Sequence, residues 1–136
     1  MGVSVWVRPK RDLPDVDPLQ TDGKLLARAM DALDGAARKL GVQPLSDFYS
    51  VSKKQALAEY GDDDLSDEEW EALADDHVWW DSARGLCSVE AFLGWVAENP
   101  SKVHRADDVI ADLEDCRRVL KVAVREGVEF NLAVSS

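Results

Sequence analysis

Two short segments with alternating apolar side chains stand near opposite ends of this chain of 136 residues. Every second residue from Val3 to Val7 is valine, and the segment Val128 to Val134 repeats the pattern with valine, phenylalanine and leucine. A period of two is typical of a strand with one buried face. Because an isolated strand leaves its backbone groups without hydrogen-bond partners, we expect the two segments to pair in a small antiparallel sheet.

The residues between the two strands have mainly helical patterns. A proline-rich loop over residues 8–20 leads to apolar side chains at helical spacing, which predict a helix from about Gly23 to Leu40. A second long helix is expected from about Ala106 to Glu126, and a glycine follows each of these two helices. Three shorter helices are expected at Ser52 to Gly61, at Ser66 to about Asp75, and at Val89 to Glu98 with Ser88 as the N-cap.

The predicted fold class is therefore α+β and predominantly helical, with the terminal strands packed against about five helices. The length is common for one domain, so residues 1–136 are expected to form a single domain. Such a sheet has two open edges, and the chain is predicted to be a monomer or a homodimer that extends the sheet through an exposed edge.

Acidic residues are concentrated in one part of the sequence. The chain has 27 Asp and Glu against 16 Lys and Arg, a net charge of −11. Eleven of the acids lie between Ala56 and Ala83, where there is no Lys or Arg, and the two signs balance elsewhere. Such a cluster is consistent with a solvated helical face or with a surface that steers a basic protein partner. This acidic face is assigned to Asp62, Asp63, Asp64, Glu68, Glu71 and Asp75.

The same cluster disfavours several kinds of ligand. Direct nucleic-acid binding is not expected, because phosphate contacts need Lys and Arg. An EF-hand that started at Asp62 would need a glycine and a glutamate where Asp67 and Leu73 stand. His77 and His104 lack the spacing of zinc ligands. We therefore expect no metal and no cofactor.

A tryptophan-rich stretch follows the acidic segment. Neighbouring side chains diverge, so we expect at least one ring of Trp79 and Trp80 to be partly exposed or to border a pocket. Arg84 could hold an anionic ligand. The alternative is that both rings fill the core and that Arg84 and Asp81 form an ordinary ion pair. The candidate ligand- or partner-binding residues are Trp79, Trp80, Asp81, Arg84, His77, Tyr49 and Trp70.

The two cysteines give little support for catalysis. Cys87 and Cys116 have neither the spacing of a metal site nor the density of a disulfide scaffold, and Cys116 fits the apolar stripe of a helix. Cys87 precedes the helix expected from Val89, a position that favours a thiolate, and a histidine could pair with it. The sequence has no nucleophile elbow, phosphate loop or dinucleotide-binding glycine pattern, so an enzyme is not expected.

These features favour a non-enzymatic interaction module. An inhibitor, immunity-type or adaptor protein could present the acidic face to a basic partner. The alternative is a small-molecule-binding protein or small enzyme with a pocket around Trp79, Trp80, Asp81 and Arg84. No apolar run is long enough to span a bilayer and no signal-peptide pattern is present, so we expect no membrane association and a cytoplasmic location.

Overall fold

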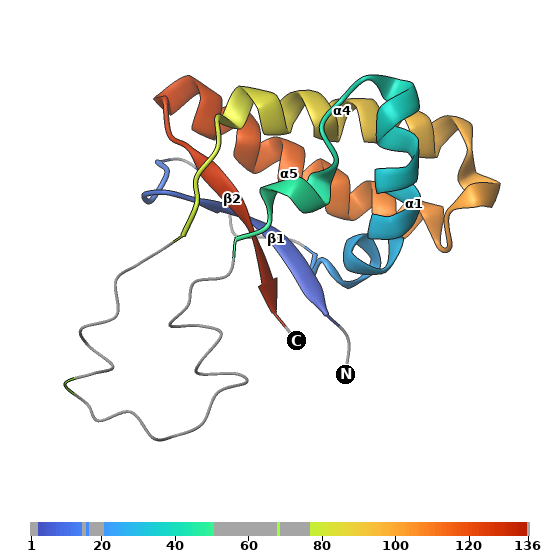
Figure 1. Cartoon of the computed structure of the whole chain (residues 1–136), viewed down its shortest axis with the longest axis horizontal. Coiled ribbons are helices and arrows are strands. Elements are labelled where there is room, and N and C mark those ends of the chain that lie inside the picture. The colour runs from blue at the N-terminus through green and yellow to red at the C-terminus, as the bar shows by residue number, and fades with distance from the viewer. Residues whose placement is uncertain (1–2, 15, 17–20, 51–67, 69–76, 136) are drawn as a thin grey trace.

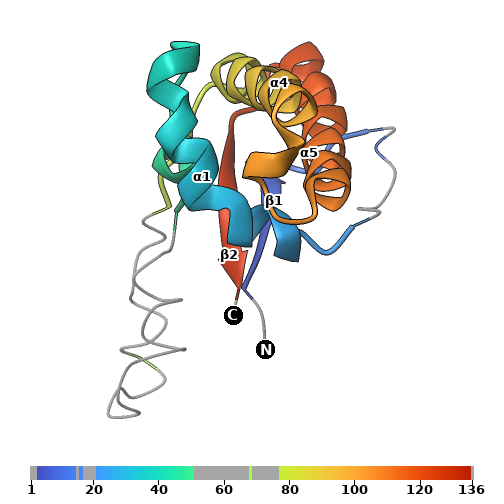
Figure 2. The ribbon, with the colours of Figure 1, turned by 90° about the vertical axis from the view of Figure 1, so that its right-hand side faces the viewer.

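The two ends of the chain pair as strands, and three helices cover the apolar face of the sheet that they form (Figure 1). The computed structural model describes residues 3–14, 16, 21–50, 68 and 77–135. The elements follow in the order β1 (Ser4–Pro9), α1 (Lys24–Leu40), the 3₁₀ helix η1 (Leu45–Phe48), α4 (Ser82–Glu98), the 3₁₀ helix η2 (Pro100–Lys102), α5 (Ala106–Glu126) and β2 (Phe130–Ser135). Figure 2 shows α4 and α5 side by side, α1 across from them, and the N- and C-termini close together.

The strands β1 and β2 are antiparallel, which confirms the pairing predicted from the two alternating segments. Val7 stands opposite Leu132, and both side chains lie in the buried apolar cluster. Arg8 stands opposite Asn131, one position further along each strand. Because successive side chains of a strand point to opposite faces, this polar pair lies on the face of the sheet that points away from the apolar cluster.

Other parts of the chain form hydrogen bonds along the outer edge of β2. The Ser50 backbone N–H donates to the Leu132 carbonyl at 3.2 Å. Trp80 and Phe130 exchange two backbone hydrogen bonds, at 2.8 and 3.0 Å. The residues that come before and after segment 51–76 therefore both attach to this edge, where they occupy backbone groups that sheet extension through the edge of β2 would need.

The predicted fold class is confirmed, but the number of helices is not. The described ranges contain three α-helices instead of about five. The predicted helices at Ser52 to Gly61 and Ser66 to Asp75 fall on residues that the structure leaves out, apart from Glu68.

The predictions for α1 and α5 are correct, whereas the predicted start of α4 is wrong. This helix begins at Ser82 instead of Val89. Its N-cap is Asp81, whose Oδ1 accepts a hydrogen bond from the Ala83 N–H at 2.9 Å, so Ser88 is not the cap. Gly85 lies inside the helix, where a Cβ atom would come within 2.2 Å of the Phe130 ring. Glycine therefore lets α4 approach β2 closely, and a glycine inside a helix is easily taken for a loop residue.

A buried carboxylate of α5 caps the N-terminus of α1. The N-cap position of α1 is Gly23, which has no side chain to accept a hydrogen bond. Asp112 Oδ2 accepts one from the Leu26 N–H at 3.0 Å instead, and Asp112 is only 5% exposed. A carboxylate at this place both satisfies a free N–H group and interacts favourably with the helix dipole. The contact ties the start of α1 to the middle of α5.

The N-cap position of α1 also requires glycine. Gly23 has a φ of 71°, and its carbonyl accepts a hydrogen bond from the Val5 N–H at 3.3 Å. A Cβ atom at Gly23 would lie 2.0 Å from the carbonyl oxygen of Val5. Glycine therefore permits both the left-handed conformation and the close contact with β1, while Asp112 supplies the missing cap.

Cys116 lies in the core beside the capping carboxylate, as its place in the apolar stripe predicted. Burial raises the pKa of its thiol to about 12, and the nearby charges of Asp112 and Asp115 act in the same direction. Cys116 therefore stays a neutral thiol at physiological pH. None of the helices in the described ranges is long and apolar enough to cross a membrane.

Replacing Asp112 should destabilise the fold. Asp112→Ala leaves the buried Leu26 N–H without its acceptor, so we expect the free energy of unfolding to fall by about 1 to 3 kcal/mol. Asp112→Asn keeps an acceptor and should lose less. The exposed Glu114, on the same helix, provides the control Glu114→Ala, which should stay within about 0.5 kcal/mol of the native protein. Urea unfolding measures all three, and equal losses for Asp112→Ala and Glu114→Ala would contradict the capping role.

Candidate functional site

Arg8 joins the two parts of the chain that flank residues 51–76. Its Nε donates to Asn131 Oδ1 at 2.9 Å, across the two strands. Its Nη2 donates to the Ser50 carbonyl at 3.1 Å and lies 3.0 Å from Nδ1 of His77. One guanidinium group therefore contacts the opposite strand, the residue before the segment and the residue after it. We call Arg8, Ser50, His77 and Asn131 the Arg8 clamp.

The members of the clamp also bind one another. Ser50 Oγ lies 3.0 Å from His77 Nδ1 and accepts a hydrogen bond from the Val78 N–H at 2.9 Å. Asn131 Nδ2 donates to the Val78 carbonyl at 3.0 Å, and Asn131 is fully buried. A guanidinium group can only donate, so His77 Nδ1 is the acceptor in its contact with Arg8. The clamp holds Ser50 and His77, the residues on either side of segment 51–76, at one place beside β2.

Trp79 and Trp80 point to different environments, as expected for neighbouring side chains. The Trp80 ring meets Phe48 edge to face, with 5.9 Å between the ring centroids, and packs against the apolar cluster. The Trp79 ring lies 5.9 Å from the guanidinium carbon of Arg8 and 6.1 Å from the ring of His77. Both tryptophans are half-buried. Trp80 thus belongs mainly to the core, whereas Trp79 lies beside Arg8 and His77 of the clamp.

Tyr49 lies next to the clamp and pairs with β2. It is half-buried and forms a parallel bridge with Leu132. Burial raises the pKa of its hydroxyl to about 12, with further contributions from the charges of Asp34 and Asp31. The hydroxyl is therefore neutral at physiological pH, which suits a structural or hydrogen-bonding group better than an acid or base.

The remaining candidate residues are not brought together as a group. Asp81 caps α4, Arg84 is exposed on that helix, and no ion pair joins the two in the part of the chain that the structure describes. Trp70 lies outside the described residues. So does the acidic face apart from Glu68, which is exposed.

Cys87 does not occupy the position that the sequence predicted. The early start of α4 places it inside the helix and on an exposed surface, instead of just before the helix N-terminus. The N-terminal N–H groups that would favour a thiolate are therefore not at this cysteine. Within the described ranges, no group of three His, Cys, Asp or Glu residues is placed to hold a metal ion.

Of the four clamp residues, only His77 was among the candidates predicted from the sequence. Arg8, Ser50 and Asn131 were not. Arg8 and Asn131 lie on the face of the sheet away from the apolar cluster, in two segments that were correctly predicted to pair. The alternating pattern does not give the register of the two strands, and this register is what sets Arg8 opposite Asn131. Ser50 gave no such signal, because its partners are 27 and 42 positions away in the chain.

The chain matches no protein-family model, no curated protein and no solved structure.

Replacing each tryptophan in turn should lower the free energy of unfolding by different amounts, because Trp80 packs in the core and Trp79 lies beside the clamp. We expect Trp80→Ala to lower the free energy of unfolding by about 3 kcal/mol, because the ring packs against the apolar cluster. Trp79→Ala should cost about 1 kcal/mol, since it removes mainly a contact with a guanidinium group. Urea unfolding of the two variants measures the difference. A loss for Trp79→Ala as large as that for Trp80→Ala would contradict this assignment.

Proposed function

We propose that this protein is a non-enzymatic interaction module that presents an acidic segment to the basic surface of a partner protein. Inhibitors, immunity-type proteins and adaptors work in this way. The observation that carries the proposal is the Arg8 clamp, which binds the residue before segment 51–76 and the residue after it.

The clamp encloses most of the charge imbalance of the chain. Residues 51–76 contain ten acidic residues and two lysines, whereas the rest of the chain has 17 acidic and 14 basic residues. Fixing both ends of a segment reduces the number of conformations that it can adopt. A partner that binds such a segment therefore loses less free energy in ordering it than it would with a free tail.

The concentration of charge favours steering over general solubility. Like charges held close together repel one another, and charges spread over the surface would keep a protein soluble equally well. A clustered field accelerates the encounter with an oppositely charged surface, and it weakens as salt shortens the Debye length from about 10 Å at 0.1 M to about 3 Å at 1 M. We further propose a cytoplasmic location and no direct binding of nucleic acid.

The alternative function, a small-molecule site around Trp79, Trp80, Asp81 and Arg84, has less support. Trp80 packs against the apolar cluster and Asp81 caps α4, so two of the four residues already have structural roles. We also favour a monomer over a dimer formed by sheet extension, because Ser50 and Trp80 occupy backbone groups of β2 at its outer edge.

The proposal is tested with two charge variants and a partner isolated from the source organism by affinity to the native protein. The first variant removes five charges from the acidic segment: Asp62→Asn, Asp63→Asn, Asp64→Asn, Glu68→Gln and Glu71→Gln. The control removes five exposed charges elsewhere: Asp31→Asn, Asp47→Asn, Glu90→Gln, Glu98→Gln and Asp107→Asn. Both variants change the net charge from −11 to −6.

We expect the segment variant to associate with the partner about tenfold more slowly than the native protein at low salt, whereas the control variant should change the rate much less. Stopped-flow measurements at about 0.05 M and 0.5 M salt should show the difference shrinking as salt rises. Equal slowing by the two variants would mean that net charge acts without regard to its position. That result, or an association rate indifferent to salt, would overturn the proposal.

A further inference from the structure

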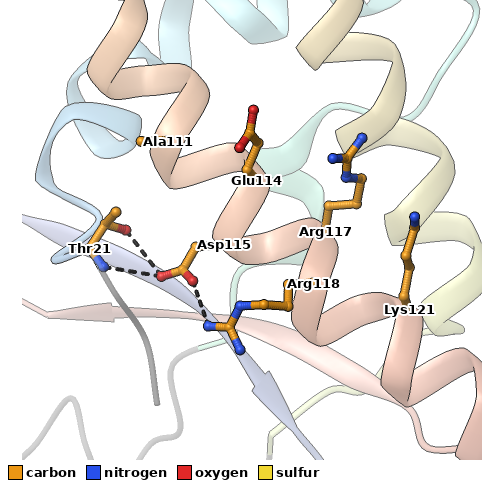
Figure 3. Close-up of a pocket in the computed structure, with 7 residues that line it drawn as sticks. All are labelled: Thr21, Ala111, Glu114, Asp115, Arg117, Arg118 and Lys121. Carbon is orange, nitrogen blue, oxygen red and sulfur yellow. Dashed lines mark hydrogen bonds and ion pairs between the residues drawn. The ribbon is translucent and has the colours of Figure 1, made fainter. Parts of the chain in front are cut away.

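The surface of α5 carries a second charged site, which uses no residue of the Arg8 clamp. A pocket of about 420 Å³ lies between this helix and Thr21 (Figure 3). Ligand pockets for small molecules usually measure about 300 to 1,000 Å³, so this one is large enough for a small metabolite. Its lining includes three cationic side chains, although the whole protein is strongly acidic.

One side of the pocket is held in place by a buried carboxylate. Asp115 Oδ2 accepts hydrogen bonds from the backbone N–H and the hydroxyl of Thr21, both at 3.2 Å. Its Oδ1 accepts one from Arg118 Nη2 at 2.6 Å. Asp115 is 7% exposed, so these bonds fix the edge of the pocket at Thr21 and direct Arg118 toward the carboxylate. Arg118 therefore shapes the site and is not its main anion-binding group.

The other two cations, Arg117 and Lys121, have hydrogen-bond donors that are available to a ligand. Arg117 and Lys121 are one turn apart on α5, and Figure 3 shows their side chains extending next to each other, away from Asp115. Neither forms a hydrogen bond or an ion pair with another side chain in the described ranges. Arg117 is half-buried, and no counter-ion pairs with it in the part of the chain that the structure describes. A bound anion would give Arg117 and Lys121 a shared charged acceptor.

We propose that Arg117 and Lys121 bind the phosphate group of a small phosphate monoester in this pocket. A guanidinium fork and a neighbouring ammonium group suit the several oxygens of a phosphate. The acidic field of the protein and the carboxylate of Glu114, which also lines the pocket, oppose any anion. A doubly charged phosphate gains more from the two cations than a carboxylate does, so it is better able to offset this repulsion.

The test follows the backbone amide resonances of Thr21 and Lys121 by NMR while glycerol 3-phosphate is added to the native protein at constant ionic strength. We expect a saturable shift, and binding of acetate should be at least about tenfold weaker. Arg117→Gln with Lys121→Gln should weaken phosphate binding about tenfold or more, since charge-assisted hydrogen bonds are lost. Glu114→Gln should strengthen it about threefold, because a repulsive charge is removed.

The control replaces two exposed cations of α1, Arg28→Gln with Lys39→Gln, and changes the net charge by the same amount as the pocket variant. It should leave the affinity within about twofold of the native value. No saturable shift, equal binding of acetate, or an equal loss in the control would overturn the proposal. Amide spectra that match the native spectrum away from α5 verify that each variant is folded.

Discussion

The antiparallel pairing of β1 with β2 is the constraint on which the interaction site depends. It brings together two segments from opposite ends of the chain and sets Arg8 opposite Asn131. It also leaves the outer edge of β2 available to residues from the middle of the chain, and Ser50 and Trp80 bind there. Without this pairing, Arg8 would have no fixed position from which to reach both ends of segment 51–76.

Close contacts and buried polar groups hold the helices on this small sheet. Gly23 and Gly85 allow α1 to contact β1 and α4 to contact Phe130, at distances that a larger residue would prevent. Asp112 then supplies the cap that Gly23 cannot, and Asp115 fixes Thr21 just before the same helix. Two carboxylates one turn apart on α5 thus organise the start of α1. Asp115 also forms one wall of the pocket in which the phosphate is proposed to bind.

Local patterns in the sequence predicted most of the fold and only part of the site. The alternating segments and the stripe of α5 identified their elements because burial imposes a period of two or of about 3.6 on the side chains. The start of α4 was missed, since its cap Asp81 stands in an aromatic stretch and the helical Gly85 resembles a break. The divergence of Trp79 and Trp80 follows from local geometry. The contacts of Arg8 do not, because they join residues 42, 69 and 123 positions apart.

Residue-by-residue amide hydrogen exchange tests the central claim most directly, namely that Arg8 fixes both ends of the acidic segment beside β2. In the native protein, the amides of Ser50, Val78 and Trp80 should be protected, because each donates a hydrogen bond within the site. In Arg8→Gln, these amides should exchange about tenfold or more faster, while that of Leu120 in the core of α5 keeps its protection. Unprotected amides at Ser50 and Val78 in the native protein, or protection unchanged by Arg8→Gln, would contradict the account.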